Sequence, residues 1–326
     1  MYFDKEQTTP AADIILANCQ TQLTRSDFST TVTNTTTGTI YYADTTKGRT
    51  YYFAGNPTDN WVKFGGFYWR IIRINEDGSI RMIYSGNSTS GPVTTGANTQ
   101  IGTSVFNYTY GDNTYVGYMM GLDNQCTTGN CEGTDKTTSY DQSVNNEYDS
   151  TIKKVLDTWY QNNLAVVSDK IDGNAGFCGD RTYVSGSGYG ANSTRYGANM
   201  RLRTNKQPTF ECTNNSDLYT TSESSQGNRA LTYPIGLITA DEVAYAGAVW
   251  PQDNANDYLQ TGQLYWTISP SSATYASVLH VGTVGIGGEE IVYRTWGVRP
   301  VINLSANVTI TGSGTSTDPY VVVGAE

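Results

Sequence analysis

The stretch "FYWRIIRINEDGSIRMIYSG" (residues 67–86) decides the expected fold more than any other part of the sequence. Aromatic or aliphatic residues alternate with polar ones on both sides of Asp77-Gly78, a dipeptide that favours tight turns. This pattern predicts a β-hairpin with one face directed into a core. The preceding residues 48–56, "GRTYYFAGN", show the same kind of alternation and predict a further strand.

Two main helices are expected further along the chain. Residues 148–164 carry apolar side chains at helical spacing, and either Asp149 or Ser150 is placed to cap a helix there. Thr239 and Glu242 have the spacing of a capping box, so a second helix is expected to begin after Thr239.

The sequence pattern divides the chain into three parts. Residues 1–46 hold a short helical pattern and a polar, Thr-rich lead-in, and residues 47–305 form the main domain. Within this domain, residues 263–270 and 297–304 predict two more strands. Residues 306–326 are either a closing strand or the start of a following module.

Composition favours a loop-rich extracellular protein over a helical cytosolic enzyme, because charged residues make up only 15% and Gly, Thr, Ser and Asn are abundant. The net charge of −10 argues against nucleic acid as a partner. No apolar run is long enough to span a membrane. The first residues are those expected downstream of a removed secretion signal or anchor.

The five cysteines leave two states open. Cys126 and Cys131 would close a short disulfide loop, and Cys178 with Cys212 would close a larger one, leaving Cys19 unpaired. The alternative is that all five are reduced and buried. A zinc site is not expected, because the spacing of Cys126 and Cys131 is too wide for the usual pair and the chain holds one histidine.

Catalytic chemistry is not indicated, and no catalytic residue, metal or cofactor is assigned. His280 is the only histidine, and although Asp241 or Asp253 could join it, no serine lies in a nucleophile elbow. Glu289 and Glu290 could bind a cation or a basic ligand, but a solvated turn is the plainer interpretation. The Asx-rich stretch 251–258 does not have calcium-loop spacing and is interpreted as an ordinary loop.

Four stretches in this order carry a family resemblance: residues 53–86, "PIGLITADEVAYAG" at 234–247, "LYWTISPSS" at 264–272 and "GVRPVINL" at 297–304. Together they resemble bacterial surface proteins with a C-type lectin-like fold, related to the formylglycine-generating-enzyme branch of that fold. The group includes the variable proteins diversified by retroelements. The resemblance covers residues 47–305. It implies an α+β, C-type lectin-like domain of mixed small sheets, two main helices and long loops.

The resemblance also implies a site. In such proteins a rigid scaffold presents a solvent-facing patch whose residues differ among variants, which here falls on 271–296, with Trp266, Arg299 and Pro300 supporting it. Small polar residues and tyrosines suit such a patch, because they combine adaptable hydrogen bonds with flat contact area. The ligand-binding residues expected are Ser271, Ser272, Ala273, Thr274, Tyr275, Ser277, Leu279, His280, Thr283, Gly285, Gly287, Tyr293, Thr295 and Trp296. The mutagenesis that diversifies such proteins acts on template adenines and does not produce Trp or Glu at the varied codons. Trp296, and Glu289 and Glu290 in the same stretch, are therefore expected to be invariant.

The function expected from these observations is recognition without reaction. The chain would be extracellular and attached to a cell surface, and its partner would be a protein or glycan on another cell or host surface. Two alternatives stay open: a structural pilus or stalk module of fixed specificity, and an extracellular carbohydrate-active enzyme. The first alternative predicts invariant apolar chain ends, and the second predicts a pair of cleft carboxylates.

Overall fold

The computed structural model describes residues 9–108, 115, 149–185, 195–222, 230–272, 276–283 and 285–326. Most of their regular structure is β-strand, arranged in several sheets with few helices. The expected mixture of sheets with few helices is therefore confirmed. Two of the sheets, with nine and seven strands among the described residues, are larger than the small sheets expected.

The predicted hairpin is confirmed. Strands β7 (Phe67–Ile74) and β8 (Ile80–Asn87) pair antiparallel across the Asp77-Gly78 turn. Asp77 closes this turn, because its carboxylate accepts hydrogen bonds from the backbone N–H and the hydroxyl of Ser79, at 2.9 and 2.6 Å. Gly78 has a φ of 83°, a conformation that glycine adopts at little cost.

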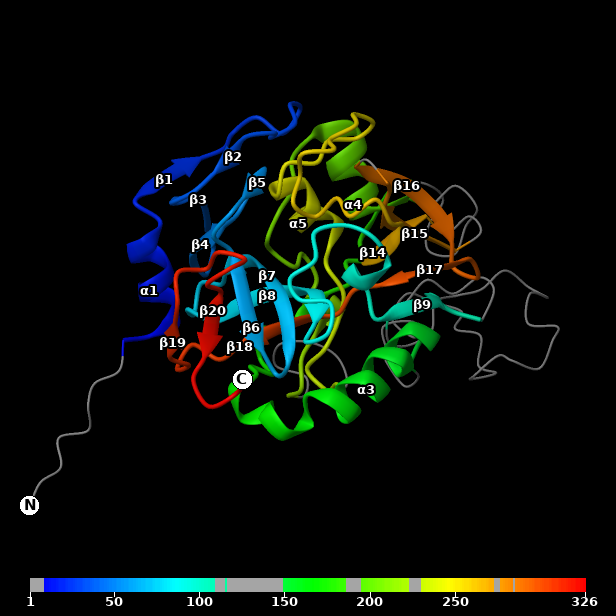
Figure 1. Cartoon of the computed structure of the whole chain (residues 1–326). Helices are drawn as coiled ribbons and strands as arrows, with labels where there is room; N and C mark the ends of the chain where they lie inside the picture. Colours follow the sequence, from blue (N-terminus) through cyan, green and yellow to red (C-terminus); the bar gives the residue numbers. More distant parts are fainter. Residues whose placement is uncertain are drawn as a thin grey trace, which may run out of the picture.

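The hairpin lies at the centre of the nine-stranded sheet (Figure 1). Strands from both ends of the chain join this sheet, and the last strand pairs in parallel with β6, so the tail contributes a closing strand. Besides β7 and β8, the sheet consists of β1 (Thr21–Thr24), β3 (Thr39–Thr45), β4 (Gly48–Tyr52), β6 (Trp61–Phe64), β18 (Val301–Leu304), β19 (Ile310–Thr311) and β20 (Tyr320–Val322).

The seven-stranded sheet holds the region expected to bind ligand. Its strands are β9 (Gly102–Val105), β11 (Tyr183–Ser185), β12 (Arg195–Tyr196), β14 (Tyr265–Ser272), β15 (Ser277–Val281), β16 (Ile286–Ile291) and β17 (Thr295–Val298). Two further pairs are short, β2 (Thr35–Thr36) with β5 (Asn56–Pro57) and β10 (Phe177–Cys178) with β13 (Leu218–Tyr219).

Both predicted helices are present. Ser150 caps α3 (Thr151–Asn163) by accepting a hydrogen bond from the N–H of Lys153, and Thr239 begins α5 (Ala240–Tyr245) with a complete capping box. The N-terminal helical pattern forms α1 (Ala11–Asn18). The remaining helical segments are short: α4 (Gly197–Met200), the π-helical η3 (Arg201–Asn205), and the 3₁₀ turns η1 (Ala97–Thr99), η2 (Ala165–Lys170) and η4 (Asn215–Asp217).

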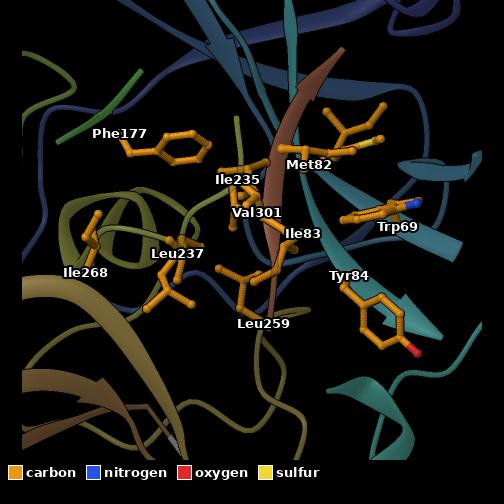
Figure 2. Packing of buried hydrophobic residues seen from close by; sticks show 14 of the residues in the cluster. Trp69, Met82, Ile83, Tyr84, Phe177, Ile235, Leu237, Leu259, Ile268 and Val301 are labelled. Atoms are coloured by element: carbon orange, nitrogen blue, oxygen red, sulfur yellow. The ribbon is translucent and has the colours of Figure 1, made fainter. Parts of the chain in front are cut away.

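One hydrophobic core joins the two large sheets. Figure 2 shows Trp69 and Ile83 of the hairpin on one side, with Leu237 and Ile268 reaching toward them from the segment before α5 and from β14. All four side chains are fully buried, which places the two sheets in fixed contact. The core positions β14 and its neighbours β15 and β16.

The disulfide between Cys178 and Cys212 is confirmed, and Cys19 is a free, buried thiol. Burial, helped by nearby Asp59, raises the pKa of Cys19 to about 12, so this cysteine is an unreactive thiol at neutral pH. The expected pair Cys126–Cys131 lies outside the described residues.

Candidate functional site

The residues expected to bind ligand are distributed over β14, β15, β16 and the turns between them. Ser271 and Ser272 end β14, Ser277 begins β15, and Gly287 lies in β16. The residues Ala273, Thr274 and Tyr275 lie outside the described part of the chain.

Their expected solvent-facing placement is wrong for about half of the described set. Five side chains are at most 8% exposed, namely Ser271, Ser272, Ser277, Leu279 and His280, and Gly285 is also buried. The reason is that β14 and β15 are interior strands of the sheet and pack against α4 and α5. The alternation of polar and apolar residues did not reveal that these strands are buried on both faces. Their polar side chains form hydrogen bonds inside the protein instead of with water.

The exposed members lie at the ends of the strands. Thr283 follows β15, and Tyr293 and Thr295 lie at the turn between β16 and β17. Tyr293 is 41% exposed, and Trp296, which follows Thr295 in the chain, is partly buried. Because β15 and β16 pair antiparallel, Thr283 lies at one end of this strand pair, and Tyr293, Thr295 and Trp296 follow its other end. We call them the rim of the sheet.

Glu289 holds together a group of buried polar side chains in this sheet. Its carboxylate accepts hydrogen bonds from the hydroxyls of Ser271 and Ser277, at 2.8 and 3.0 Å, and pairs with Arg203 at 3.4 Å. Asn199 donates to the Ser271 hydroxyl at 2.7 Å. Burial raises the pKa of Glu289, but the bond from Ser271 and the charge of Arg203 outweigh burial and set a net pKa below the usual value. The expectation of a solvated turn at Glu289 is therefore wrong.

Aromatic and basic side chains gather on the neighbouring part of the sheet. The ring of His280 stacks on Trp296, with centroids 4.8 Å apart, and Trp296 also meets the edge of Trp266 at 6.2 Å. The guanidinium of Arg203, from η3, lies 4.4 Å from the ring centroid of Trp250. Such stacking holds the rings in fixed orientations without any covalent link.

Three of these side chains converge on Gly288 of β16, and Trp296 joins them by its stacking on His280. A methyl group placed on Gly288 would lie 3.7 Å from His280 Cε1, 3.8 Å from Arg203 Nη2 and 3.8 Å from Trp250 Cζ3. We call His280, Arg203, Trp250 and Trp296 the Gly288 cluster. Sequence reasoning missed Arg203 and Trp250, because both come from segments distant in the chain and neither belongs to a recognisable motif.

Three nitrogen atoms of the Gly288 cluster are buried without a hydrogen-bond partner among the described residues. They are His280 Nδ1, Arg203 Nε and Trp296 Nε1. Burial lowers the pKa of His280, which Glu290 opposes and Arg203 supports, so the imidazole is neutral at pH 7. The cluster therefore holds two N–H donors and one imidazole nitrogen that a polar ligand could satisfy.

The other residues weighed as catalytic or supporting have structural partners. Asp241 binds Arg201 through both carboxylate oxygens at 2.9 Å, and Asp253 is exposed. Arg299, expected to support the patch, is fully buried and donates to the backbone carbonyls of Tyr84 in β8 and of Leu259.

The Asx-rich loop at 251–258 also has internal partners. Asn254 is buried and donates to the carbonyls of Val32 and Gly247, at 3.0 and 3.2 Å. In the described part of the chain, no three His, Cys, Asp or Glu side chains are grouped so that they could hold a metal ion. None of the helices described there is long and apolar enough to cross a bilayer.

A cavity of about 210 Å³ forms a second candidate site, which sequence reasoning did not find. It lies between the turn after β3, the hairpin and the start of α5, and the disulfide Cys178–Cys212 forms part of its wall. Its lining is rich in charged side chains of both signs.

Comparison with family models, with curated proteins and with solved structures finds no match for this chain. The candidate sites are therefore interpreted from their own contacts and chemistry.

Proposed function

We propose that this protein binds a ligand on another cell or host surface through the rim of the seven-stranded sheet and the Gly288 cluster. The scaffold is proposed to be a C-type lectin-like domain attached to the outside of a bacterial cell. Its action is recognition of a protein or glycan, with no chemical reaction. The disulfide Cys178–Cys212 supports an extracellular location, because disulfides persist in oxidising compartments.

The observation that carries this proposal is the set of three unpartnered nitrogen atoms around Gly288. A buried polar atom without a hydrogen bond costs on the order of 1–3 kcal/mol, so a polar group that entered this cluster and bonded to these atoms would be favoured. The stacked rings of Trp296 and His280 add flat contact area, and aromatic and Arg side chains dominate the binding energy of protein surfaces.

Recognition is favoured over catalysis by the surroundings of His280. A catalytic histidine is oriented by a hydrogen bond from one ring nitrogen to a carboxylate or carbonyl. Here Nδ1 has no partner among the described residues, and the ring is held by stacking on Trp296. This arrangement supports recognition over catalysis as the role of His280.

We also propose that a retroelement diversifies this protein, at fewer positions than the sequence pattern predicted. Thr283, Tyr293 and Thr295 are exposed, and substitutions at exposed positions usually change stability little. In contrast, Ser271 and Ser277 hold Glu289, so replacing them would leave a half-buried carboxylate without its donors.

Replacing Trp296 by alanine is expected to weaken binding to target cells by roughly 30-fold, because hot-spot side chains contribute about 2 kcal/mol or more. The measurement is flow cytometry of the labelled protein on a panel of bacterial and animal cells. Arg203→Gln, which keeps an N–H donor and removes the charge, should also weaken binding. Val166→Ala, an exposed apolar residue on η2 at 90% exposure, is the matched control and should bind like the wild type. Equal binding by all four proteins would contradict the proposed site.

A further inference from the structure

Arg203 has one free edge of its guanidinium group within the Gly288 cluster. Its Nη1 pairs with the Glu289 carboxylate at 3.4 Å, and the group lies 4.4 Å from the ring centroid of Trp250. In the part of the chain that the structure describes, Nε is buried without a partner and Nη2 makes no hydrogen bond. Nε and Nη2 form one edge of a guanidinium, and two parallel N–H bonds from such an edge bind a carboxylate. The free edge of Arg203 is therefore suited to one carboxylate.

A small space borders this edge at Gly288. The atoms nearest to a methyl group placed on Gly288 are Arg203 Nη2, His280 Cε1 and Trp250 Cζ3, at 3.7 to 3.8 Å. Apart from the chain neighbours of Gly288, no described atom comes closer, so the glycine leaves room for a small group. Arg203, Trp250 and Trp296 are partly exposed, so the cluster reaches the protein surface.

The two carboxylates of β16 have other partners and do not occupy the free edge. One oxygen of Glu289 pairs with Nη1 of the arginine, and the other accepts the hydroxyls of Ser271 and Ser277. Glu290 pairs with Arg294 at 3.9 Å. The edge formed by Nε and Nη2 is thus left for a carboxylate that a ligand supplies.

Positive charge prevails around the cluster, although the chain as a whole has a net charge of −10. The ammonium of Lys206 donates to the backbone carbonyl of Trp250, and the charge of Arg195 acts on Glu289. The charged side chains linked to the cluster by such contacts are the basic Arg195, Arg203, Lys206 and Arg294 and the acidic Glu289 and Glu290. An anionic group is therefore favoured here over a cationic one.

The other two unpartnered nitrogen atoms suit hydroxyl groups. Nε1 of Trp296 only donates hydrogen bonds, whereas Nδ1 of the neutral His280 ring donates or accepts according to its tautomer. A hydroxyl both accepts and donates, so it satisfies either atom. Aromatic side chains with a few placed polar groups are also the usual lining of sites for small molecules. A compact ring that carries one carboxylate and several hydroxyls is an acidic sugar, such as a uronic or a sialic acid.

We propose that the Gly288 cluster binds the carboxylate of an acidic sugar through the Nε–Nη2 edge of Arg203. The hydroxyl groups of the sugar bond to Trp296 Nε1 and His280 Nδ1. This inference rests on the proposed function, because it names the ligand class of the same site, and it selects a glycan over a protein as the partner.

Isothermal titration calorimetry of the full chain with methyl β-D-glucuronide and with N-acetylneuraminic acid tests this inference. At least one of them should bind. Methyl β-D-glucoside has the same ring as the glucuronide but no carboxylate, and it should bind at least about tenfold more weakly. N-acetyl-L-glutamate α-amide offers a carboxylate without sugar hydroxyls and should be weaker by a similar factor.

Two variants test the geometry of the site. Arg203→Lys keeps the positive charge but lacks the paired N–H edge, so it should weaken binding of the acidic sugar at least about tenfold. Gly288→Ala fills the space beside this edge with a methyl group at ordinary contact distances, so it should keep the wild-type free energy of unfolding and weaken binding by a similar factor. Arg294→Lys, at a side chain that is 60% exposed, is the matched control and should bind like the wild type.

Three results would overturn the inference. The first is the absence of binding by both acidic sugars at concentrations on the order of 10 mM, where even a millimolar site is occupied. The second is equal binding of the glucoside or of the glutamate derivative, and the latter would assign the carboxylate to a protein partner. The third is unchanged affinity in both site variants with intact far-ultraviolet circular dichroism. If both acidic sugars fail while Trp296→Ala still weakens binding to cells, this inference is wrong and the proposed function stands.

Discussion

Replacing Glu242 by glutamine is expected to lower the free energy of unfolding by about 3–5 kcal/mol, because the change leaves two buried guanidinium groups without their shared carboxylate. Glu242 is 3% exposed and pairs with Arg81 and Arg73. Burial raises its pKa, but the two arginines and the backbone N–H of Thr239 outweigh burial, so the carboxylate is charged in the folded protein. Glutamine has the same shape and keeps an acceptor for Thr239, so the substitution isolates the charge.

Urea unfolding at pH 7 measures this effect, and Thr239→Ala provides the control. Thr239 caps the same helix by accepting the N–H of Glu242 at 3.0 Å, and loss of such a cap costs about 1 kcal/mol. We therefore expect the glutamine variant to be the less stable of the two by a clear margin. If both variants lost the same small amount, the ion pairs would contribute nothing beyond helix capping.

Replacing Asp257 by asparagine is expected to change how stability depends on pH. Asp257 is 2% exposed; one carboxylate oxygen accepts the N–H of Leu259 at 2.9 Å, and the other has no partner among the described residues. Burial raises the pKa of Asp257 to about 8, although the bond from Leu259 and the charges of Arg25 and Arg70 act to lower it. The carboxyl group is therefore mostly protonated at pH 7 in the folded protein.

The direction of this pH dependence follows from the binding of a proton to Asp257 in the folded protein. The folded-state pKa lies above the unfolded value of about 3.9, so the stabilisation is complete below pH 3.9 and is lost as the pH rises through 8. The loss is about 1.4 kcal/mol per pH unit, or about 4 kcal/mol between pH 5 and pH 8. The asparagine variant does not titrate and should lack this loss. Other titrating groups, including His280, are present in both proteins and cancel in the comparison.

The measurement is the free energy of unfolding of both proteins at several values between pH 5 and pH 8. Asp253→Asn serves as the control, because Asp253 is exposed and its removal should leave the wild-type pH dependence intact. Parallel curves for wild type and Asp257→Asn would show that this carboxyl group is not protonated in the folded protein.

The features that sequence predicts correctly are local ones. The hairpin depends on alternation and on one turn at Asp77-Gly78, and each helix start depends on a cap within three residues of its partner. Such contacts are encoded in windows of a few residues, so pattern reasoning reaches them.

The features that sequence reasoning missed depend on distant segments. The cavity brings Arg73, Arg201 and Glu242 together from three separate regions, and the Gly288 cluster adds Arg203 and Trp250 to strands far along the chain. Polar residues such as Ser271 have the composition of a surface patch although they are buried, because their hydrogen bonds to Glu289 and Asn199 replace those to water. Periodicity carries no information about such tertiary partners.

Sequencing of this gene across many isolates tests the central claim most directly, because it locates the contact surface whatever the ligand is. The account predicts adenine-directed substitutions concentrated at the exposed rim positions Thr283, Tyr293 and Thr295, beside a template repeat and a reverse transcriptase. Glu289 and its donors Ser271 and Ser277 should stay constant. A rim as invariant as the hairpin at 67–86 would contradict a variable contact surface and would favour a surface module of fixed specificity.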